Sequence, residues 1–234
     1  MSRPSEVRTI LEGVVGSTAY GLATPDSDID VLGVYAVPLR HALRVDWHAT
    51  NATIHRNDPD TTHHEVQKFL RLVCAGNPTV TELLWLDDYT VTTPAGRSLV
   101  EHRRAFLSTR HVRSAYLGYA NQQAKRLERR HADGREGFAS DLRKRTRKHG
   151  RHCWRLLLQA EHALRTGDVL VHVGDRRDDV FAIGELAERD PIAFARTVEH
   201  KMEQVKATPS VLGDEPDIEL ADTLLYRIRL NELG

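Results

Sequence analysis

The sequence has few cysteines and no long apolar run. Its two cysteines, Cys74 and Cys153, each lie inside an apolar helical pattern, so we expect two core residues in a reducing compartment rather than a disulfide framework. No run approaches the roughly 20 apolar residues that a membrane span requires. The N-terminal MSRPSEVRTI also lacks an apolar stretch after its basic residue. We therefore expect a cytoplasmic protein with no membrane partner.

The net charge of zero conceals an uneven distribution of charge along the chain. Residues 1–99 carry 8 Lys and Arg against 12 Asp and Glu, whereas residues 100–180 carry 19 against 10. Residues 181–234 are acidic again, with 6 against 11. The basic middle third suits a phosphate-rich partner such as a nucleotide or RNA, and a solvated helical face is the alternative. A zero net charge argues against non-specific coating of nucleic acid.

Hydrophobic periodicity predicts an α/β (α+β) fold, with a small mixed sheet followed by a helical lobe. Residues 10–15 and 28–37 have the β-branched and apolar pattern of strands, and the polar stretch 47–60 could hold another strand. We assign residues 1–98 to the sheet-containing core and 99–234 to the helical, partly basic lobe. The expected helices cover about 64–75, 79–86, 103–130, 142–166, 183–206 and 218–233.

A short pattern near the N-terminus carries the chemistry. Gly16-Ser17 ends the first strand and is followed, ten residues later, by Asp28-Ile29-Asp30. If a helix begins at Gly16, its free backbone N–H groups and the Ser17 hydroxyl can bind a phosphate. Asp28 and Asp30, two apart on a strand, would present two carboxylates on one face, which suits Mg²⁺. This pattern fits metal-assisted nucleotidyl transfer.

A calcium-binding loop is the main rival interpretation of these aspartates. Asp26, Asp28 and Asp30 match the first ligand positions of an EF-hand, which then requires Gly at its sixth position and Glu at its twelfth. Val31 and Val37 occupy those two positions, so the EF-hand interpretation fails. A cation remains the simplest partner for a carboxylate at the start of an apolar strand.

This pattern resembles the signature of the DNA polymerase β-type nucleotidyltransferase superfamily. More closely, GSTAYGLATPDSDIDVLGVY at residues 16–35 resembles the RNA-ligase-associated nucleotidyltransferase-like family. Residues 64–72, 77–85 and 148–157 also look like that family, and the likeness covers roughly residues 8–190. The resemblance implies transfer of a nucleoside monophosphate from an NTP to a hydroxyl, with release of pyrophosphate. The resemblance does not identify the acceptor, which could be an RNA end, a protein side chain or a small molecule.

The resemblance also implies a metal site that a third carboxylate completes. Asp28 and Asp30 would hold two Mg²⁺ ions, for which Mn²⁺ can substitute, and Asp60 is our choice for the third ligand and for helping to deprotonate the acceptor. Asp58 and Glu65 are the alternatives, because residues 57–60 also fit a plain turn. Without a third carboxylate, the protein would be a nucleotide- or RNA-binding module that catalyses poorly.

Basic residues are the remaining candidates for nucleotide binding. Gly16 and Ser17 would bind the β- and γ-phosphates, and Lys68 is expected to project toward the site from its helix. Arginines recur every four residues over the basic helix 143–155, which could bind triphosphate or an RNA acceptor, with ion pairs to acidic neighbours as the alternative. The resemblance singles out Lys148 and Arg155 there. A toxin or antitoxin partnership is a weaker hypothesis, and zinc is disfavoured because neither histidine cluster supplies a full ligand set.

Overall fold

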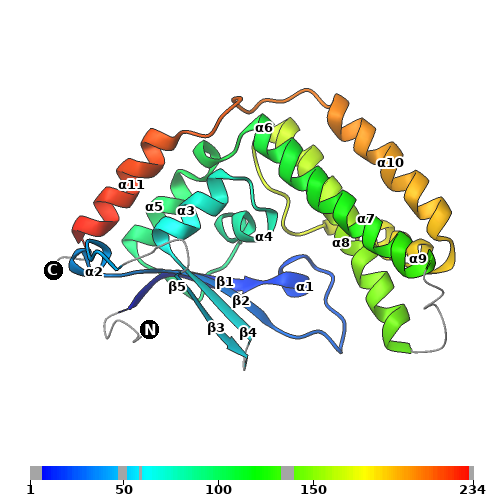
Figure 1. Ribbon diagram of the computed structural model, residues 1–234, viewed down its shortest axis with the longest axis horizontal. Coiled ribbons are helices and arrows are strands. Elements are labelled where there is room, and N and C mark those ends of the chain that lie inside the picture. The colour runs from blue at the N-terminus through cyan, green and yellow to red at the C-terminus, as the bar shows by residue number, and fades with distance from the viewer. Residues whose placement is uncertain (1–6, 47–51, 58–59, 133–139, 232–234) are drawn as a thin grey trace. The chain divides into compact units, whose positions relative to one another are not determined.

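The computed structural model describes residues 7–46, 52–57, 60–132 and 140–231. The chain divides into two compact units, one formed by residues 1–108 with 215–234 and the other by residues 109–214 (Figure 1). This division differs from the sequence-based one in two ways: the boundary lies after residue 108 rather than 98, and the last helix belongs to the first unit. The backbone N–H of Asp217 donates to the carbonyl of Ala105 at 2.8 Å, which ties the return segment to that unit.

The first unit contains a five-stranded mixed sheet with the strand order β3-β4-β2-β1-β5. β2 and β4 are parallel, and the other neighbouring strands are antiparallel. The strands are β1 (Arg8–Val15), β2 (Asp30–Ala36), β3 (Thr53–Asn57), β4 (Asp60–Glu65) and β5 (Val91–Thr92).

Short helices cover one face of this sheet in Figure 1. Two of them begin at a capped residue followed by proline: Asn77 accepts from the backbone N–H of Val80, and Thr93 accepts from that of Gly96. The helical elements of this unit are α1 (Gly16–Ala19), α2 (Leu39–Ala42), α3 (Val66–Cys74), α4 (Pro78–Thr81), η2 (Glu82–Trp85), α5 (Pro94–Glu101), η3 (Arg103–Phe106) and α11 (Ile218–Asn231).

The core of the first unit lies between the sheet and these helices. Leu11 and Val34 from the sheet and Phe69 from α3 are fully buried. Gly96 lets α5 approach β1 closely, because a Cβ there would collide with the carbonyl oxygen of Ile10. Cys74 is free and buried, as predicted.

The second unit is helical. Its elements are α6 (Thr109–His111), the π-type turn η4 (Val112–Tyr116), α7 (Leu117–Ala132), α8 (Ser140–Thr166), η5 (Gly174–Arg176), α9 (Arg177–Arg189) and α10 (Pro191–Ala207). Two glycines let α8 and α9 pack tightly: a Cβ on Gly150 would lie 2.6 Å from that of Ala187, and one on Gly184 would lie 2.7 Å from Cγ of Arg151. Pro191, capped by Asp190, separates α9 from α10 where the sequence predicts one helix.

The predicted fold class, a small mixed sheet with packed helices after it, is confirmed. The helix expected from residue 64 begins instead at Val66, because residues 60–65 pair as β4 between β2 and β3. Among the helices that the structure describes, none is both long and apolar enough to cross a membrane.

Candidate functional site

Gly16 joins the end of β1 to the start of α1. Its φ of +67° is a left-handed conformation that glycine adopts without steric cost. A Cβ at this position would also collide with the carboxylate of Asp30, the first residue of β2. Glycine is therefore required here on two counts, and the Asp30 carboxylate lies directly against the Gly16-Ser17 backbone.

The parallel pairing of β2 and β4 brings a second carboxylate to the same place. Asp30 and Asp60 are register partners at the beginning of the two strands. Register partners on neighbouring strands project from the same face, with strands about 4.8 Å apart. The sequence favoured Asp60, just ahead of the predicted helix, as the third carboxylate and left a plain turn at residues 57–60 as the alternative. The structure places Asp60 in a strand beside Asp30.

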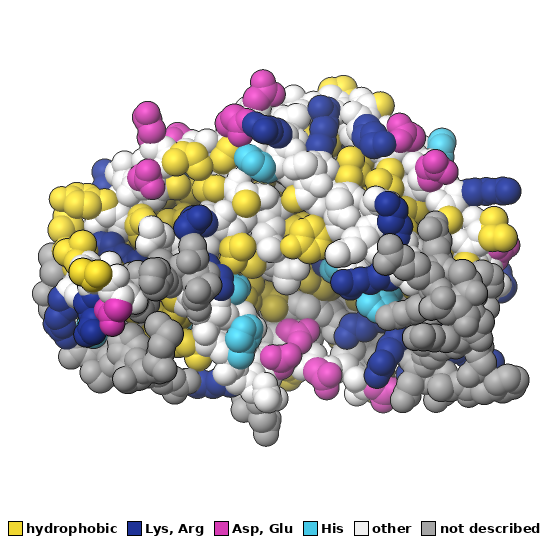
Figure 2. Space-filling view, viewed as in Figure 1, with side chains coloured by type: hydrophobic (Ala, Val, Ile, Leu, Met, Phe, Trp, Pro, Cys, Tyr) yellow, Lys and Arg dark blue, Asp and Glu magenta, His cyan; other side chains and the backbone are white. Residues whose placement is uncertain are grey.

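Asp28 does not lie on the strand. The predicted strand 28–37 is shortened to Asp30–Ala36, so the strand alternation that was expected to align Asp28 with Asp30 does not apply. Asp28 lies in the exposed segment that leads into β2. Figure 2 shows a group of acidic side chains on the surface next to α1, where this segment enters the sheet.

The two alternatives for the third carboxylate have different outcomes. Asp58 lies outside the described residues. Glu65 is fully buried at the opposite end of β4 from Asp60, and its Oε1 pairs with Nη2 of Arg229 at 2.6 Å. Its Oε2 accepts from the backbone N–H of Gln67 at 2.9 Å. Glu65 therefore caps α3 and neutralises a buried arginine, and it is not available to a metal at the Asp30 end.

The donor set fits a hard divalent cation. Within the described ranges, no group of three or more His, Cys, Asp and Glu is gathered closely enough to hold a metal ion by itself. Mg²⁺ usually binds proteins through one or two carboxylates and completes its shell with water and substrate phosphates. Asp30 and Asp60, beside the Gly16 backbone, supply that kind of incomplete oxygen site.

Lys68 is not brought together with the aspartates. Its Nζ donates to the hydroxyl of Thr53 at 2.6 Å, and that hydroxyl also hydrogen-bonds Nδ1 of His64 at 3.0 Å. These residues lie at the end of the sheet that is remote from Asp60. Burial, followed by the charge of Lys68, lowers the pKa of His64 to about 4, so its imidazole is neutral.

A second polar network, not predicted from sequence, crosses the other face of the sheet. Nε2 of His63 lies 2.7 Å from Oε2 of Glu12, and the Thr90 hydroxyl donates to Oε1 of Glu12 at 2.8 Å. The imidazole covers Gly33, where a Cβ would meet the ring. His63 and His64 are consecutive strand residues, so their side chains point to opposite faces of the sheet. They therefore cannot both bind the same zinc ion.

The basic helix is α8, which belongs to the second unit, whereas the aspartates belong to the first. Part of its arginine stripe is used for packing against α9. Arg143 and Arg147 both pair with Glu188, and the guanidinium of Arg151 lies 4.6 Å from the ring centroid of Phe181. The alternative of ion pairs within a helical bundle accounts for this part of the stripe.

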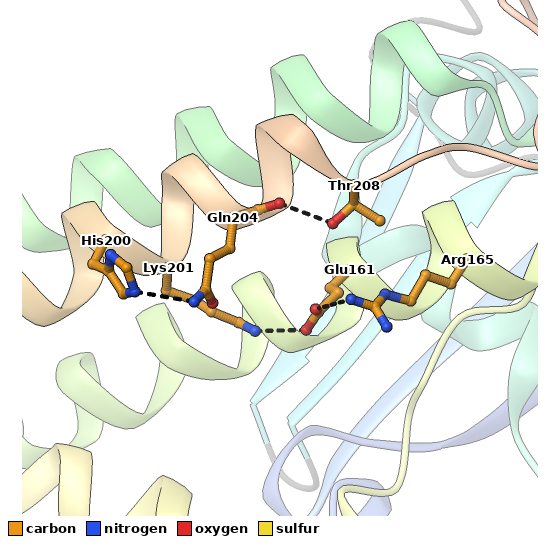
Figure 3. Close-up of polar contacts among 6 residues, drawn as sticks. All are labelled: Glu161, Arg165, His200, Lys201, Gln204 and Thr208. Atoms are coloured by element: carbon orange, nitrogen blue, oxygen red, sulfur yellow. Dashed lines mark hydrogen bonds and ion pairs between the residues drawn. The ribbon is translucent and has the colours of Figure 1, made fainter.

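Glu161, near the C-terminus of α8, pairs with two cations. Oε2 of Glu161 pairs with Nζ of Lys201 from α10 at 2.6 Å, and Oε1 pairs with Nη2 of Arg165 at 2.9 Å (Figure 3). Burial raises the pKa of Glu161, but the hydrogen bond and charge of Lys201 outweigh it, and the net pKa is lowered. Glu161 is therefore a charged bridge between α8 and α10.

The two cations that the resemblance singled out have different surroundings. Arg155 is 1% exposed and donates from Nη2 to Nδ1 of His152 at 3.2 Å. Burial, followed by the charge of Arg155, lowers the pKa of His152 to about 3, so the ring accepts as a neutral imidazole. Arg155 is thus an interior residue, whereas the sequence groups it with the cationic side of the helix. Lys148 is exposed on α8.

Comparison with known proteins identifies the family of the chain. Residues 1–219 match the RNA repair pathway DNA polymerase beta family. An uncharacterised 38.9 kDa protein from the nrdC–mobD intergenic region of Enterobacteria phage T4 is 30% identical over 129 residues. That match covers 50% of this chain and 38% of the phage protein, so the chain spans well under two thirds of its relative's length.

A solved structure was also found. A nucleotidyltransferase-like protein from Exiguobacterium sibiricum 255-15 is 15% identical, with a TM-score of 0.34 and coverage of 97% of this chain and 75% of that chain. The family match covers the sheet, α1 and the basic helix alike. The chain therefore belongs to the RNA repair pathway DNA polymerase beta family.

Proposed function

We propose that this protein is a Mg²⁺-dependent nucleotidyltransferase that transfers NMP from an NTP to a hydroxyl acceptor and releases pyrophosphate. The observation that carries the proposal is the parallel register that sets Asp60 beside Asp30, next to the Gly16-Ser17 turn. Family membership supports the same reaction class. Carboxylates and a phosphate-binding turn at one end of a sheet are the parts that metal-assisted phosphoryl transfer requires.

In the proposed reaction, the acceptor oxygen attacks the α-phosphorus while the bond to the β-phosphate oxygen breaks. The electron pair leaves with pyrophosphate, and the acceptor proton passes to Asp60. Asp28, Asp30 and Asp60 would hold two Mg²⁺ ions, or Mn²⁺ in their place, which supply charge neutralisation and a lowered pKa of the acceptor hydroxyl when bound. Gly16 and Ser17 would bind the β- and γ-phosphates by hydrogen bonds. Neither residue would act as a nucleophile.

The proposed acceptor is an RNA end. The family description points to RNA repair, and α8 and α7 carry exposed cations in the second unit, among them Lys148 and Arg126. Lys148→Gln should weaken RNA binding and reduce its salt dependence by about one phosphate contact. Arg147→Gln is the matched control, because its guanidinium pairs with Glu188 and should change RNA affinity less. Fluorescence anisotropy with labelled single-stranded RNA over a salt series measures both.

The donor site is tested by titrating NTPs into the protein calorimetrically, with and without Mg²⁺. The proposal expects metal-dependent binding that the Asp28→Ala, Asp30→Ala double variant loses. A matched control is the Asp87→Ala, Asp88→Ala double variant, which removes two exposed carboxylates of the same unit. Binding that ignores Mg²⁺, or that both double variants lose equally, contradicts the proposed site.

One observation favours a second function, a nucleotide- or RNA-binding module with little catalysis. Asp28 is exposed and lies outside β2, so strand alternation does not align its carboxylate with that of Asp30. Transfer of radiolabel from α-labelled NTP to RNA separates the two functions. Label that appears with the wild type and disappears with Asp60→Ala supports catalysis, whereas tight NTP binding without transfer supports the binding module.

A further inference from the structure

A buried carboxylate outside the aspartate cluster contacts the segment that carries Gly16 and Ser17. The Tyr20 hydroxyl donates to Oε1 of Glu82 at 2.5 Å, across 62 residues of sequence. Hydroxyl-to-carboxylate bonds of this length are charge-assisted and stronger than neutral ones. Neither residue was a candidate in the sequence, because an isolated Tyr or Glu has no spacing signature.

α1 has little hydrophobic anchorage of its own. None of its four residues, all of which the structure describes, is buried. Gly21, with φ +70°, ends the helix, and the Leu22 N–H donates to the Ser17 carbonyl at 2.9 Å. The first buried side chain after α1 is that of Leu22, which is 6% exposed, and the Tyr20 side chain reaches from the helix terminus to a fixed point elsewhere.

Glu82 is such a fixed point. It begins η2 and is 0% exposed, and the next two residues, Leu83 and Leu84, are also fully buried. η2 packs against β1, the strand that leads into Gly16. A carboxylate held this firmly by the core can restrain the hydroxyl that bonds it, because moving it would expose or unpair a buried charge.

We propose that Glu82 is a positioning residue for the nucleotide: through Tyr20 it holds the Gly16-Ser17 segment against Asp30, in the orientation that binds the triphosphate. The inference rests on the proposed function. Glu82 contacts no reacting atom in this account. Its contribution is to reduce the ordering that α1 would otherwise undergo when the NTP binds.

The test uses the full chain and a non-hydrolysable ATP analogue with Mg²⁺ in calorimetry. Tyr20→Phe keeps the ring and removes the donor, so the Kd should rise about tenfold, the scale of one charged hydrogen bond. Glu82→Gln retains an accepting oxygen and should bind within about threefold of wild type, whereas Glu82→Leu should resemble Tyr20→Phe. Tyr226→Phe, an exposed tyrosine on α11, is the matched control.

The outcomes separate this inference from the function on which it rests. A wild-type protein that binds no NTP overturns both. Wild-type binding with an unchanged Kd in Tyr20→Phe overturns the positioning role alone. Thermal unfolding of each variant supplies the second readout. The proposal requires that Glu82→Gln bind nucleotide more tightly than Glu82→Leu under conditions in which both variants are folded. A loss that tracks unfolding alone assigns Glu82 a purely structural role.

Discussion

Removing Arg229 from α11 should destabilise the first unit strongly. Its guanidinium is 7% exposed, pairs with the fully buried Glu65 at 2.6 Å and donates from Nη1 to the carbonyl of Val37 at 3.2 Å. Arg229→Met would leave the Glu65 carboxylate buried with only its backbone partners. Breaking one side of a buried ion pair costs about 3–5 kcal/mol, a large share of the roughly 5–15 kcal/mol that stabilises a typical domain.

The pH dependence gives this prediction a distinctive sign. Burial raises the pKa of Glu65 while Arg229 lowers it, and the net pKa is raised. Without Arg229 the native-state pKa rises further, so native Glu65 binds a proton at pH values where the unfolded chain does not. Stability of the variant should then fall as pH rises between the unfolded and native pKa values, by up to about 1.4 kcal/mol per pH unit.

Urea unfolding at about pH 5 and pH 8 measures both effects. A Trp154→Phe background confines tryptophan fluorescence to the first unit, because the other tryptophans of the sequence lie within residues 1–108. Arg227→Met, at an exposed position on the same helix, is the control. A loss below about 1 kcal/mol at pH 8, or an equal loss at both pH values, would refute the reasoning on the buried pair.

Two further predictions concern a turn and a bridge. Gly16→Ala should cost about 1–2 kcal/mol of backbone strain. It should also weaken NTP binding, because the added Cβ would displace the Asp30 carboxylate. Gly174→Ala is the control: Gly174 has φ +56° but open space around it, so this variant should show strain without the loss of binding. Lys201→Met should lower the melting temperature more than Arg165→Met, because the Arg165 side chain is 64% exposed and that of Lys201 is 13% exposed. Calorimetry and thermal unfolding by circular dichroism check the two pairs.

Local pattern was sufficient for much of the first unit. Apolar and β-branched residues specify β1 and β2 because they suit a pleated, half-buried surface, and Gly16-Ser17 marks the point where β1 must stop. The helical period equally identifies α3 and α8. Boundaries were less well predicted, since residues 64 and 65 belong to a strand only because β2 and β3 provide partners for it.

The sequence by itself determined the glycine-serine turn, the aspartates after it and the cationic character of α8, because each of these depends on residues close together in the chain. Only the tertiary structure decided that Asp60 lies beside Asp30, that Glu65 faces Arg229 and that Glu82 meets Tyr20. It also decided that Arg155 lies in the interior. Strand register and burial are set by long-range pairing and packing, and these carry no signal in the local order of residue types.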